Sequence, residues 1–167
     1  MRIATELKAA GCADSPEKFR DRLLEEFIDR FPNTTIDDLL CDPERSVQFC
    51  RGIRTGVGTE NLIDVVILKS LTNIRKRRDC PTNLKKRKRR NLQKELEAVG
   101  CRLEVDEFKT VVCDCMADMY KSRTIDELLC HPNEARELCE YARRKACCGA
   151  LGDLLILSTL MNARKSP

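Results

Sequence analysis

The sequence predicts an all-α protein: a tandem duplication of a roughly four-helix unit, with two similar helical halves joined by a basic helical linker. Composition is the first observation, because a chain of 167 residues that is 42% hydrophobic can bury a core, yet it has five Phe, two Tyr and no Trp. That mixture favours helices, since a sheet would contain more β-branched and aromatic residues. The other two observations are an internal repeat and apolar residues with a period near 3.6.

The internal repeat has an offset of 89 residues, and it is clearest where TIDDLLCDP at 35–43 returns as TIDELLCHP at 124–132. Without a gap, residues 1–78 align with residues 90–167 at 24 identical positions, far more than chance supplies. A fixed period of this kind indicates a repeated structural unit. We therefore expect helical repeat unit 1 at 1–78, a basic linker at 79–89 and helical repeat unit 2 at 90–167.

The first two helices of each unit are marked by their boundaries. Gly11 in LKAAGC and Gly100 in LEAVGC predict the end of the first helix, because glycine readily adopts the left-handed conformation after a last turn. Ser15 and Pro16 predict the start of the second helix, as its cap and first residue. Apolar residues at helical spacing then form its buried stripe: Phe19, Leu23, Phe27 and Phe31 in the first unit, and Phe108, Val112, Met116 and Tyr120 in the second.

The repeated nine letters predict a corner between two helices. Thr124 and Glu127 have the spacing of a capping box, and Thr35 with Asp38 places the same charge on a shorter side chain. One short turn follows, and the proline at the ninth position then begins the next helix. Because every repeated residue has a capping or burial role, we interpret the motif as a structural corner rather than as a binding motif.

The last helix of each unit, LIDVVILKSLTNIRK in the first copy, is apolar nearly all round and should be buried. Asp64 and Asp153 lie inside this pattern, and a buried carboxylate needs a partner. The arginines retained nearby are Arg54 and Arg143. We therefore expect structural ion pairs here rather than catalytic carboxylates.

The eleven cysteines predict reduced thiols. The stretch MRIATELKAAGC lacks a signal-peptide core, so we expect a cytoplasmic protein, in which disulfides are rare. In the second unit, CDC at 113–115 and CC at 147–148 could approach each other across two helices. No CxxC spacing occurs, however, and His131 is the lone histidine. We therefore predict no metal ion and no cofactor, and keep a cysteine-based metal or redox protein as the weaker alternative.

Catalytic and nucleotide-binding patterns are scarce. The stretch TGVGTEN at 55–61 puts glycines before a helix but has no Walker lysine, so we interpret it as a hinge. With a single histidine there is no nucleophile–base set, and we predict that the protein is not an enzyme. No window approaches the roughly 18 apolar residues of a membrane span. We expect neither a membrane partner nor a small-molecule substrate.

The strongest functional signal is the basic segment, residues 75–90, RKRRDCPTNLKKRKRR. It has ten Lys or Arg and one Asp, a net charge of +9, whereas the whole chain carries +4 and the remainder therefore −5. Such a density is typical of contact with polyanions. We predict a non-enzymatic protein that binds the phosphates of DNA or RNA through Arg75, Lys76, Arg77, Arg78, Lys85, Lys86, Arg87, Lys88, Arg89 and Arg90.

Two alternatives remain for this segment and for the chain. The segment could be a solvated linker, and the chain a protein-interaction or scaffold module whose two helical repeats bind a protein partner. Pro81, Thr82 and Asn83 have the character of a turn and cap. We therefore expect RKRR to end the last helix of unit 1, and KKRKRR to lie in a lengthened first helix of unit 2. No aromatic residue interrupts the basic run, so base stacking is not expected.

Overall fold

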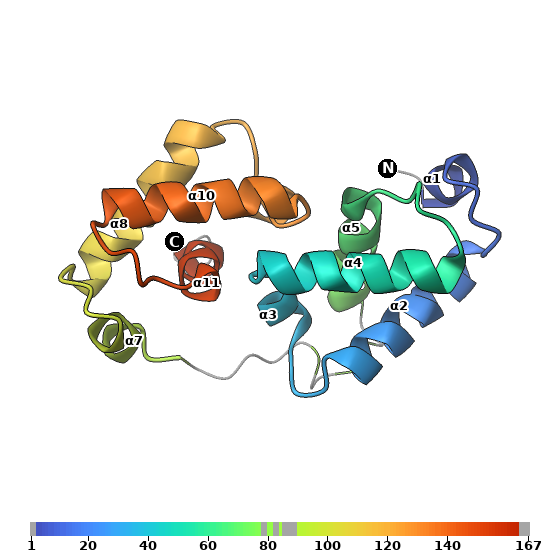
Figure 1. Ribbon diagram of the computed structural model, residues 1–167, viewed down its shortest axis with the longest axis horizontal. Helices are drawn as coiled ribbons and strands as arrows, with labels where there is room; N and C mark the ends of the chain where they lie inside the picture. Colours follow the sequence, from blue (N-terminus) through green and yellow to red (C-terminus); the bar gives the residue numbers. More distant parts are fainter. Residues whose placement is uncertain (1–2, 78–79, 82–83, 85–89, 164–167) are drawn as a thin grey trace. The chain divides into compact units, whose positions relative to one another are not determined.

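The computed structural model describes residues 3–77, 80–81, 84 and 90–163 of the chain, and the prediction of an all-α fold is confirmed for them. These residues form ten helices and no strand (Figure 1). The chain divides into two compact units, whose main segments are residues 1–40 and 44–87 for the first and 88–167 for the second.

Five helices are described in each unit. The two short helices at the predicted corners, α3 and α9, account for the difference from the four that the sequence predicts. In the first unit the helices are α1 (Ile3–Ala9), α2 (Pro16–Arg30), α3 (Ile36–Leu40), α4 (Pro43–Val57) and α5 (Asp64–Lys76). In the second they are α7 (Leu92–Ala98), α8 (Val105–Met119), α9 (Ile125–Leu128), α10 (Pro132–Lys145) and α11 (Asp153–Ala163).

The first helix of each unit ends at the glycine that the sequence predicts. Gly11 has φ 75° and Gly100 has φ 68°, both in the left-handed region. The next amide closes the helix in both places, since Cys12 N donates to Leu7 O at 2.9 Å and Cys101 N to Leu96 O at 2.9 Å. These are the bonds of a Schellman ending, and they satisfy carbonyls that the helix leaves without a partner.

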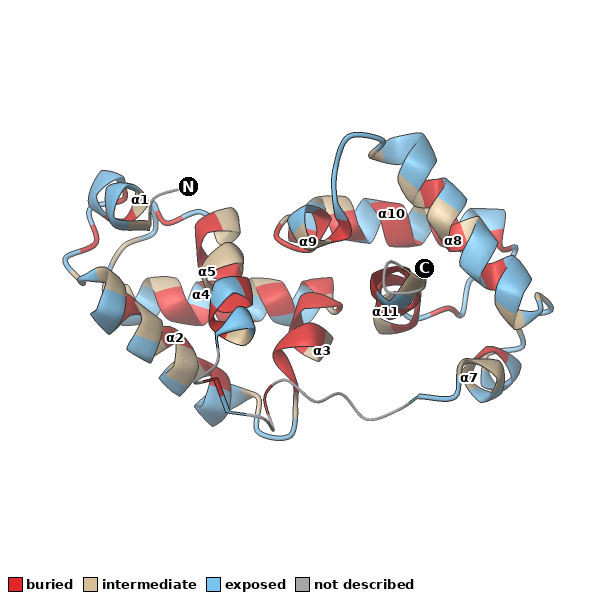
Figure 2. Cartoon of the chain, turned by 180° about the vertical axis from the view of Figure 1, so that it is seen from behind, coloured by how far each residue is buried: buried red, intermediate tan, exposed pale blue. Residues whose placement is uncertain are grey.

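The second helix of the first unit starts at Pro16 after the Ser15 cap, as predicted, and the second helix of each unit buries one stripe. Lys18 N donates to Ser15 Oγ at 3.3 Å before α2, and Glu104 N donates to Glu107 Oε2 at 3.1 Å at the start of α8. Both helices expose most of their length and bury a narrow apolar face (Figure 2). The buried residues are Phe19, Leu23 and Phe27 on α2, and Phe108, Val112 and Cys115 on α8.

The repeated nine-letter motif is a helix-to-helix corner in both units. Glu127 N donates to Thr124 Oγ1 at 3.3 Å and Thr124 N donates to Glu127 Oε2 at 2.9 Å, which completes the predicted capping box. In the first unit, Asp38 N donates to Thr35 Oγ1 at 3.1 Å. The turn between cap and proline is itself a short helix, and the next helix then begins at the proline.

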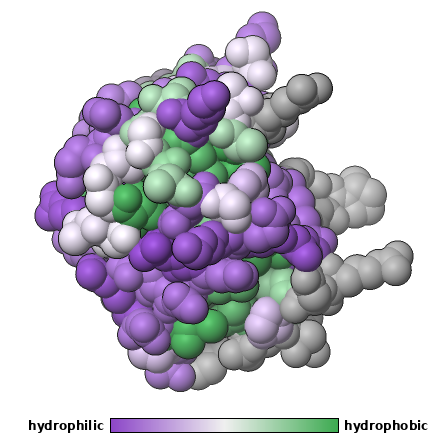
Figure 3. Space-filling model, turned by 90° about the vertical axis from the view of Figure 1, so that its right-hand side faces the viewer, coloured by the Kyte–Doolittle hydropathy of each residue, from purple (hydrophilic) through white to green (hydrophobic). Residues whose placement is uncertain are grey.

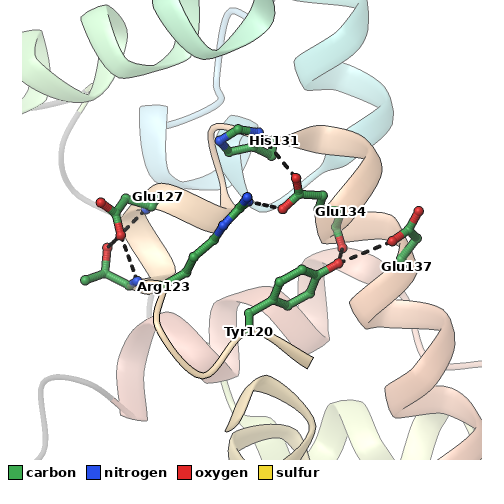
Figure 4. Close-up of polar contacts among 7 residues, drawn as sticks. Tyr120, Arg123, Glu127, His131, Glu134 and Glu137 are labelled. Carbon is green, nitrogen blue, oxygen red and sulfur yellow. Dashed lines mark hydrogen bonds and ion pairs between the residues drawn. The ribbon is translucent and has the colours of Figure 1, made fainter. Parts of the chain in front are cut away.

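A polar cluster braces the corner of the second unit (Figure 4). Tyr120 Oη donates to Glu134 O at 3.2 Å and to Glu137 Oε2 at 3.3 Å. Arg123 forms an ion pair with Glu134, whose other carboxylate oxygen lies 3.6 Å from His131 Nδ1. Burial and the neighbouring glutamates raise the pKa of the Tyr120 hydroxyl, which keeps it a donor. The lone histidine therefore belongs to a structural contact at the start of α10.

The last helix of each unit begins at its aspartate, not before it. The sequence places Asp64 and Asp153 inside the helix, but α5 and α11 start at these residues, where a carboxylate also interacts favourably with the helix dipole. Most of α11 is buried: Leu155, Ile156, Leu157, Ser158, Thr159, Leu160 and Met161.

The predicted arginine partners are confirmed, and each makes the same two contacts. Arg54 forms an ion pair with Asp64, and its Nε donates to Leu62 O at 2.7 Å. Arg143 pairs with Asp153, and its Nε donates to Leu151 O at 2.7 Å. One guanidinium thus joins the end of a long helix to the loop and first residue of the next. We call this arrangement the arginine clip.

Arg143→Lys should lower the free energy of unfolding by about 2 kcal/mol, because a lysine ammonium cannot bond both a backbone carbonyl and a carboxylate in this planar geometry. Chemical denaturation followed by circular dichroism measures the change. Arg136→Lys is the matched control, since Arg136 is exposed on the same helix. The control should stay within about 0.5 kcal/mol of the parent. Equal effects of the two substitutions would show that the clip does not stabilise the unit.

Candidate functional site

The basic segment is described only at its two ends. Four of the ten predicted phosphate-binding residues lie in the described part of the chain: Arg75, Lys76, Arg77 and Arg90. The other six lie outside the described residues: Arg78, Lys85, Lys86, Arg87, Lys88 and Arg89.

Arg75 is held inside the first unit. It lies in the last turn of α5 and forms an ion pair with Asp37 on α3, and the two side chains are only 13% and 11% exposed. Removing either partner would leave a charge in a largely buried place, so the pair has a structural role. The sequence analysis missed this contact. The available signal was that Asp37 and Arg75 both recur 89 residues later, as Asp126 and Arg164.

Lys76 and Arg77 form the exposed end of α5. The helix ends at Lys76 because Arg77 takes an extended conformation, with φ −74° and ψ 153°. The expectation that RKRR continues the helix is therefore corrected after its second residue. Both side chains are exposed, which puts two positive charges on the surface beside the C-terminal end of this helix. A helix C-terminus carries partial negative charge, so cations are favourable there.

Arg90 and Asn91 mark the other end of the segment. Lys94 N donates to Asn91 Oδ1 at 3.1 Å, so Asn91 caps α7 and the helix begins at Leu92. The expected lengthened first helix is therefore corrected at this point. Arg90 lies before the cap and makes two contacts with the Glu95 carboxylate, at 2.7 Å and 2.5 Å. A bidentate pair of this kind fixes the orientation of the arginine on the start of α7.

A pocket of about 240 Å³ lies beside the same end of α5 in the first unit. It is lined by α1, α2 and α5, and combines buried apolar side chains with more exposed polar ones. Hydrophilic side chains cover most of the face shown in Figure 3, and apolar side chains gather there in separate patches. The lining includes Phe19, Leu23 and Ile74 together with Arg20, Asn73 and Arg77.

The second unit has a hollow at a corresponding place in the sequence. Leu92 and Val105 line an open pocket of about 460 Å³, and they lie 89 residues after Ile3 and Pro16, which line the first. The sequence analysis did not identify either pocket. A usable signal was the identity of Asn73 with Asn162, an exposed polar position on the most apolar helix of each unit.

None of the eleven cysteines, all of which lie in the described part of the chain, forms a disulfide with another, and most are buried. Among the described residues, no three or more His, Cys, Asp or Glu are grouped so as to hold a metal ion. Burial raises the pKa of the Cys139 thiol, and the nearby Asp153 carboxylate raises it further. In the second unit, burial raises the pKa of the Cys101 thiol, and the neighbouring Cys148 thiol raises it further. The sequence suggested a contact between CDC and CC and indicated a small buried apolar side chain at Cys101, and it did not predict that Cys101 and Cys148 are neighbours.

The predicted hinge at 55–61 is half helical. Helix α4 continues to Val57, and Gly58 ends it with φ 69°, so the loop is shorter than the glycines suggested. In the second unit, Cys147 follows α10 with φ 50°, a left-handed conformation that a residue with a side chain seldom adopts. Cys147 lies 89 residues after Gly58 and is exposed.

The chain matches no protein-family model, and no curated protein or solved structure is significantly similar to it. The function proposed below is therefore drawn from the residues and contacts of this chain alone. Within the described part of the chain, no helix combines the length and the apolar character that crossing a bilayer requires.

Cys147→Gly should raise the free energy of unfolding by about 1 kcal/mol, because glycine has no Cβ and adopts this backbone conformation without strain. Thermal or urea unfolding under reducing conditions measures it. The reciprocal control is Gly58→Ala, which should lower stability by a similar amount, since Gly58 has φ +69° and the space around it is open. A destabilised Cys147→Gly variant would show that the thiol makes contacts worth more than the backbone strain.

Proposed function

We propose that this protein is a non-enzymatic nucleic-acid-binding protein that contacts the phosphates of DNA or RNA through the basic segment. The observation that carries the proposal is the separation of charge along the chain. The segment has a net charge of +9, residues 1–74 have −3 and residues 91–167 have −2. Cations at this density release condensed counterions from a nucleic acid, and that release drives binding.

The contacts at the two ends of the segment suggest which of its residues anchor it and which contact phosphates. Arg75 is engaged by Asp37 and Arg90 by Glu95, so we assign these two to anchoring the segment on its flanking helices. Lys76 and Arg77 are exposed and support a role at the surface. We assign phosphate contact to the remaining eight: Lys76, Arg77, Arg78, Lys85, Lys86, Arg87, Lys88 and Arg89.

We further infer that the units on either side are copies of one ancestral unit. Support comes from boundaries that recur at the same offset, since α2 and α8 start 89 residues apart, as do α4 and α10. The arginine clip supports the same inference, because both its residues and both its contacts recur. In this proposal each duplicated unit anchors one end of the basic segment.

The proposal implies binding with little sequence preference. Phosphate contacts fix the position of a protein on a nucleic acid but carry no direct information about bases. No aromatic residue lies within the basic segment, so stacking on unpaired bases is not supported. We expect duplex DNA and RNA of different sequences to bind with similar affinity.

A protein-interaction module is the second candidate, and the two pockets favour it. The pocket of the first unit has an apolar interior with Arg20 and Arg77 in its lining, a combination that suits an amphipathic helix with acidic side chains. Binding of that kind depends on apolar surface. Added salt screens interactions between exposed charges and leaves apolar contacts largely unchanged, so the affinity should persist at moderate salt. Salt dependence therefore separates the two candidates.

If about six cations contact phosphates, the slope of log affinity against log salt should be near −5 for duplex DNA. Replacing Lys85, Lys86, Arg87, Lys88 and Arg89 with Gln or Ser should reduce both affinity and slope. Fluorescence anisotropy with labelled duplexes at several salt concentrations measures both quantities. The far-ultraviolet circular dichroism of the variant should stay near that of the parent.

The matched control removes the same number of charges from exposed positions on the helical units and should keep most of the affinity. A parent protein without salt-dependent binding at low salt would refute the nucleic-acid proposal and leave the interaction module. A control as weak as the test variant would show that only total charge matters. The control positions are Lys8, Lys18, Arg51, Arg102 and Lys121.

A further inference from the structure

In the second unit, two thiols from distant parts of the sequence meet where two helices end. Cys101 follows Gly100 at the end of α7, and Cys148 follows α10. Cys148 Sγ donates to Val99 O at 3.7 Å, which places it against the backbone just before Cys101. Burial raises the pKa of the Cys101 thiol, and the neighbouring Cys148 thiol raises it further. A disulfide of about 2.05 Å between these neighbouring sulfurs would join the end of α7 to the loop after α10.

We propose that Cys101 and Cys148 are a redox-active pair, which a peroxide oxidises to a disulfide that ties the end of α7 to the loop after α10. This modification site is independent of the basic segment. Oxidation would close residues 101–148 into a covalent loop and restrict the unfolded chain, which stabilises the folded unit.

The first unit shows that a thiol is not required for the structural contact at this place. Thr59 lies 89 residues before Cys148, and its Oγ1 donates to Ala10 O at 2.7 Å. Ala10 likewise lies 89 residues before Val99. A hydroxyl therefore makes the same contact with a shorter and stronger bond, so hydrogen bonding alone does not explain a cysteine at 148. A second thiol beside Cys101 adds a chemistry that Cys12 and Thr59 lack.

The oxidation balances with one peroxide. Cys101, which is partly exposed, loses its proton and attacks hydrogen peroxide to give a sulfenic acid and water. The Cys148 thiol then attacks the sulfenic sulfur, the S–S bond forms and a second water leaves. Two thiols thus give two electrons and two protons to the peroxide. Burial raises the pKa of Cys101, which slows the first step near neutral pH relative to a low-pKa thiol.

Treatment of the full chain with hydrogen peroxide, followed by alkylation and peptide mapping by mass spectrometry, tests the proposal. We expect a peptide linked through Cys101 and Cys148, reversed by dithiothreitol, and a thermal midpoint several degrees higher in the oxidised protein. Cys148→Thr is the control that preserves the fold, because it copies Thr59, and it should lose both the linked peptide and the midpoint shift. Linkage of Cys101 to Cys147 instead, or full alkylation of both thiols after peroxide, would overturn the proposal.

Thr59→Cys supplies a second, independent measurement. The introduced thiol should lie beside Cys12 and form an additional disulfide in the first unit under the same treatment. Failure of this folded variant to form the link, while Cys101 and Cys148 also remain reduced, would contradict the geometry on which the proposal depends. Formation of both disulfides would show that the backbone at these equivalent positions permits the bond in either unit.

Discussion

The arginine clip holds the loops that lead into α5 and α11, the helices that most other helices of each unit contact. The carbonyls of Leu62 and Leu151 lie in those loops, and a buried carbonyl without a donor is costly. One guanidinium supplies that donor and also neutralises the aspartate that begins the helix. This one contact therefore holds the loop before α5 or α11, and the first residue of that helix, against the preceding long helix.

The parts of the fold that the sequence predicted were local or repeated. Glycine endings, proline starts and capping residues act within a few positions, so Gly11 or Thr124 indicates its own structure. The clip was predictable because both partners recur. The ion pair between Asp37 and Arg75 was harder to predict, because the two residues are 38 positions apart. Arg75 also belongs to the basic segment, which suggested a phosphate-binding role for it instead. The helix boundaries beside that run were mispredicted, because lysine and arginine favour helices while the Asn91 cap determines where α7 begins.

Because both units are net acidic, the proposal directs a nucleic acid to the basic segment and away from the surfaces of the units. Residues 1–74 and 91–167 are both net negative, so a nucleic acid would be repelled from their surfaces at distances where the segment attracts it. The carboxylates of Asp37 and Glu95 form ion pairs with the first and last arginines of the segment. The basic segment was thus visible in the sequence as charge, whereas the ion pairs of Arg75 and Arg90 were visible only in the contacts.

The hydroxyl of Tyr120 that braces the second corner also makes the two units optically distinguishable. The chain has no tryptophan, and both of its tyrosines, Tyr120 and Tyr141, belong to the second unit. Each hydroxyl bonds a carboxylate, Tyr120 to Glu137 and Tyr141 to Asp118. Carboxylates quench phenol emission, and melting of this unit would remove them. Intrinsic fluorescence therefore reports the second unit against a dark first unit, without any label.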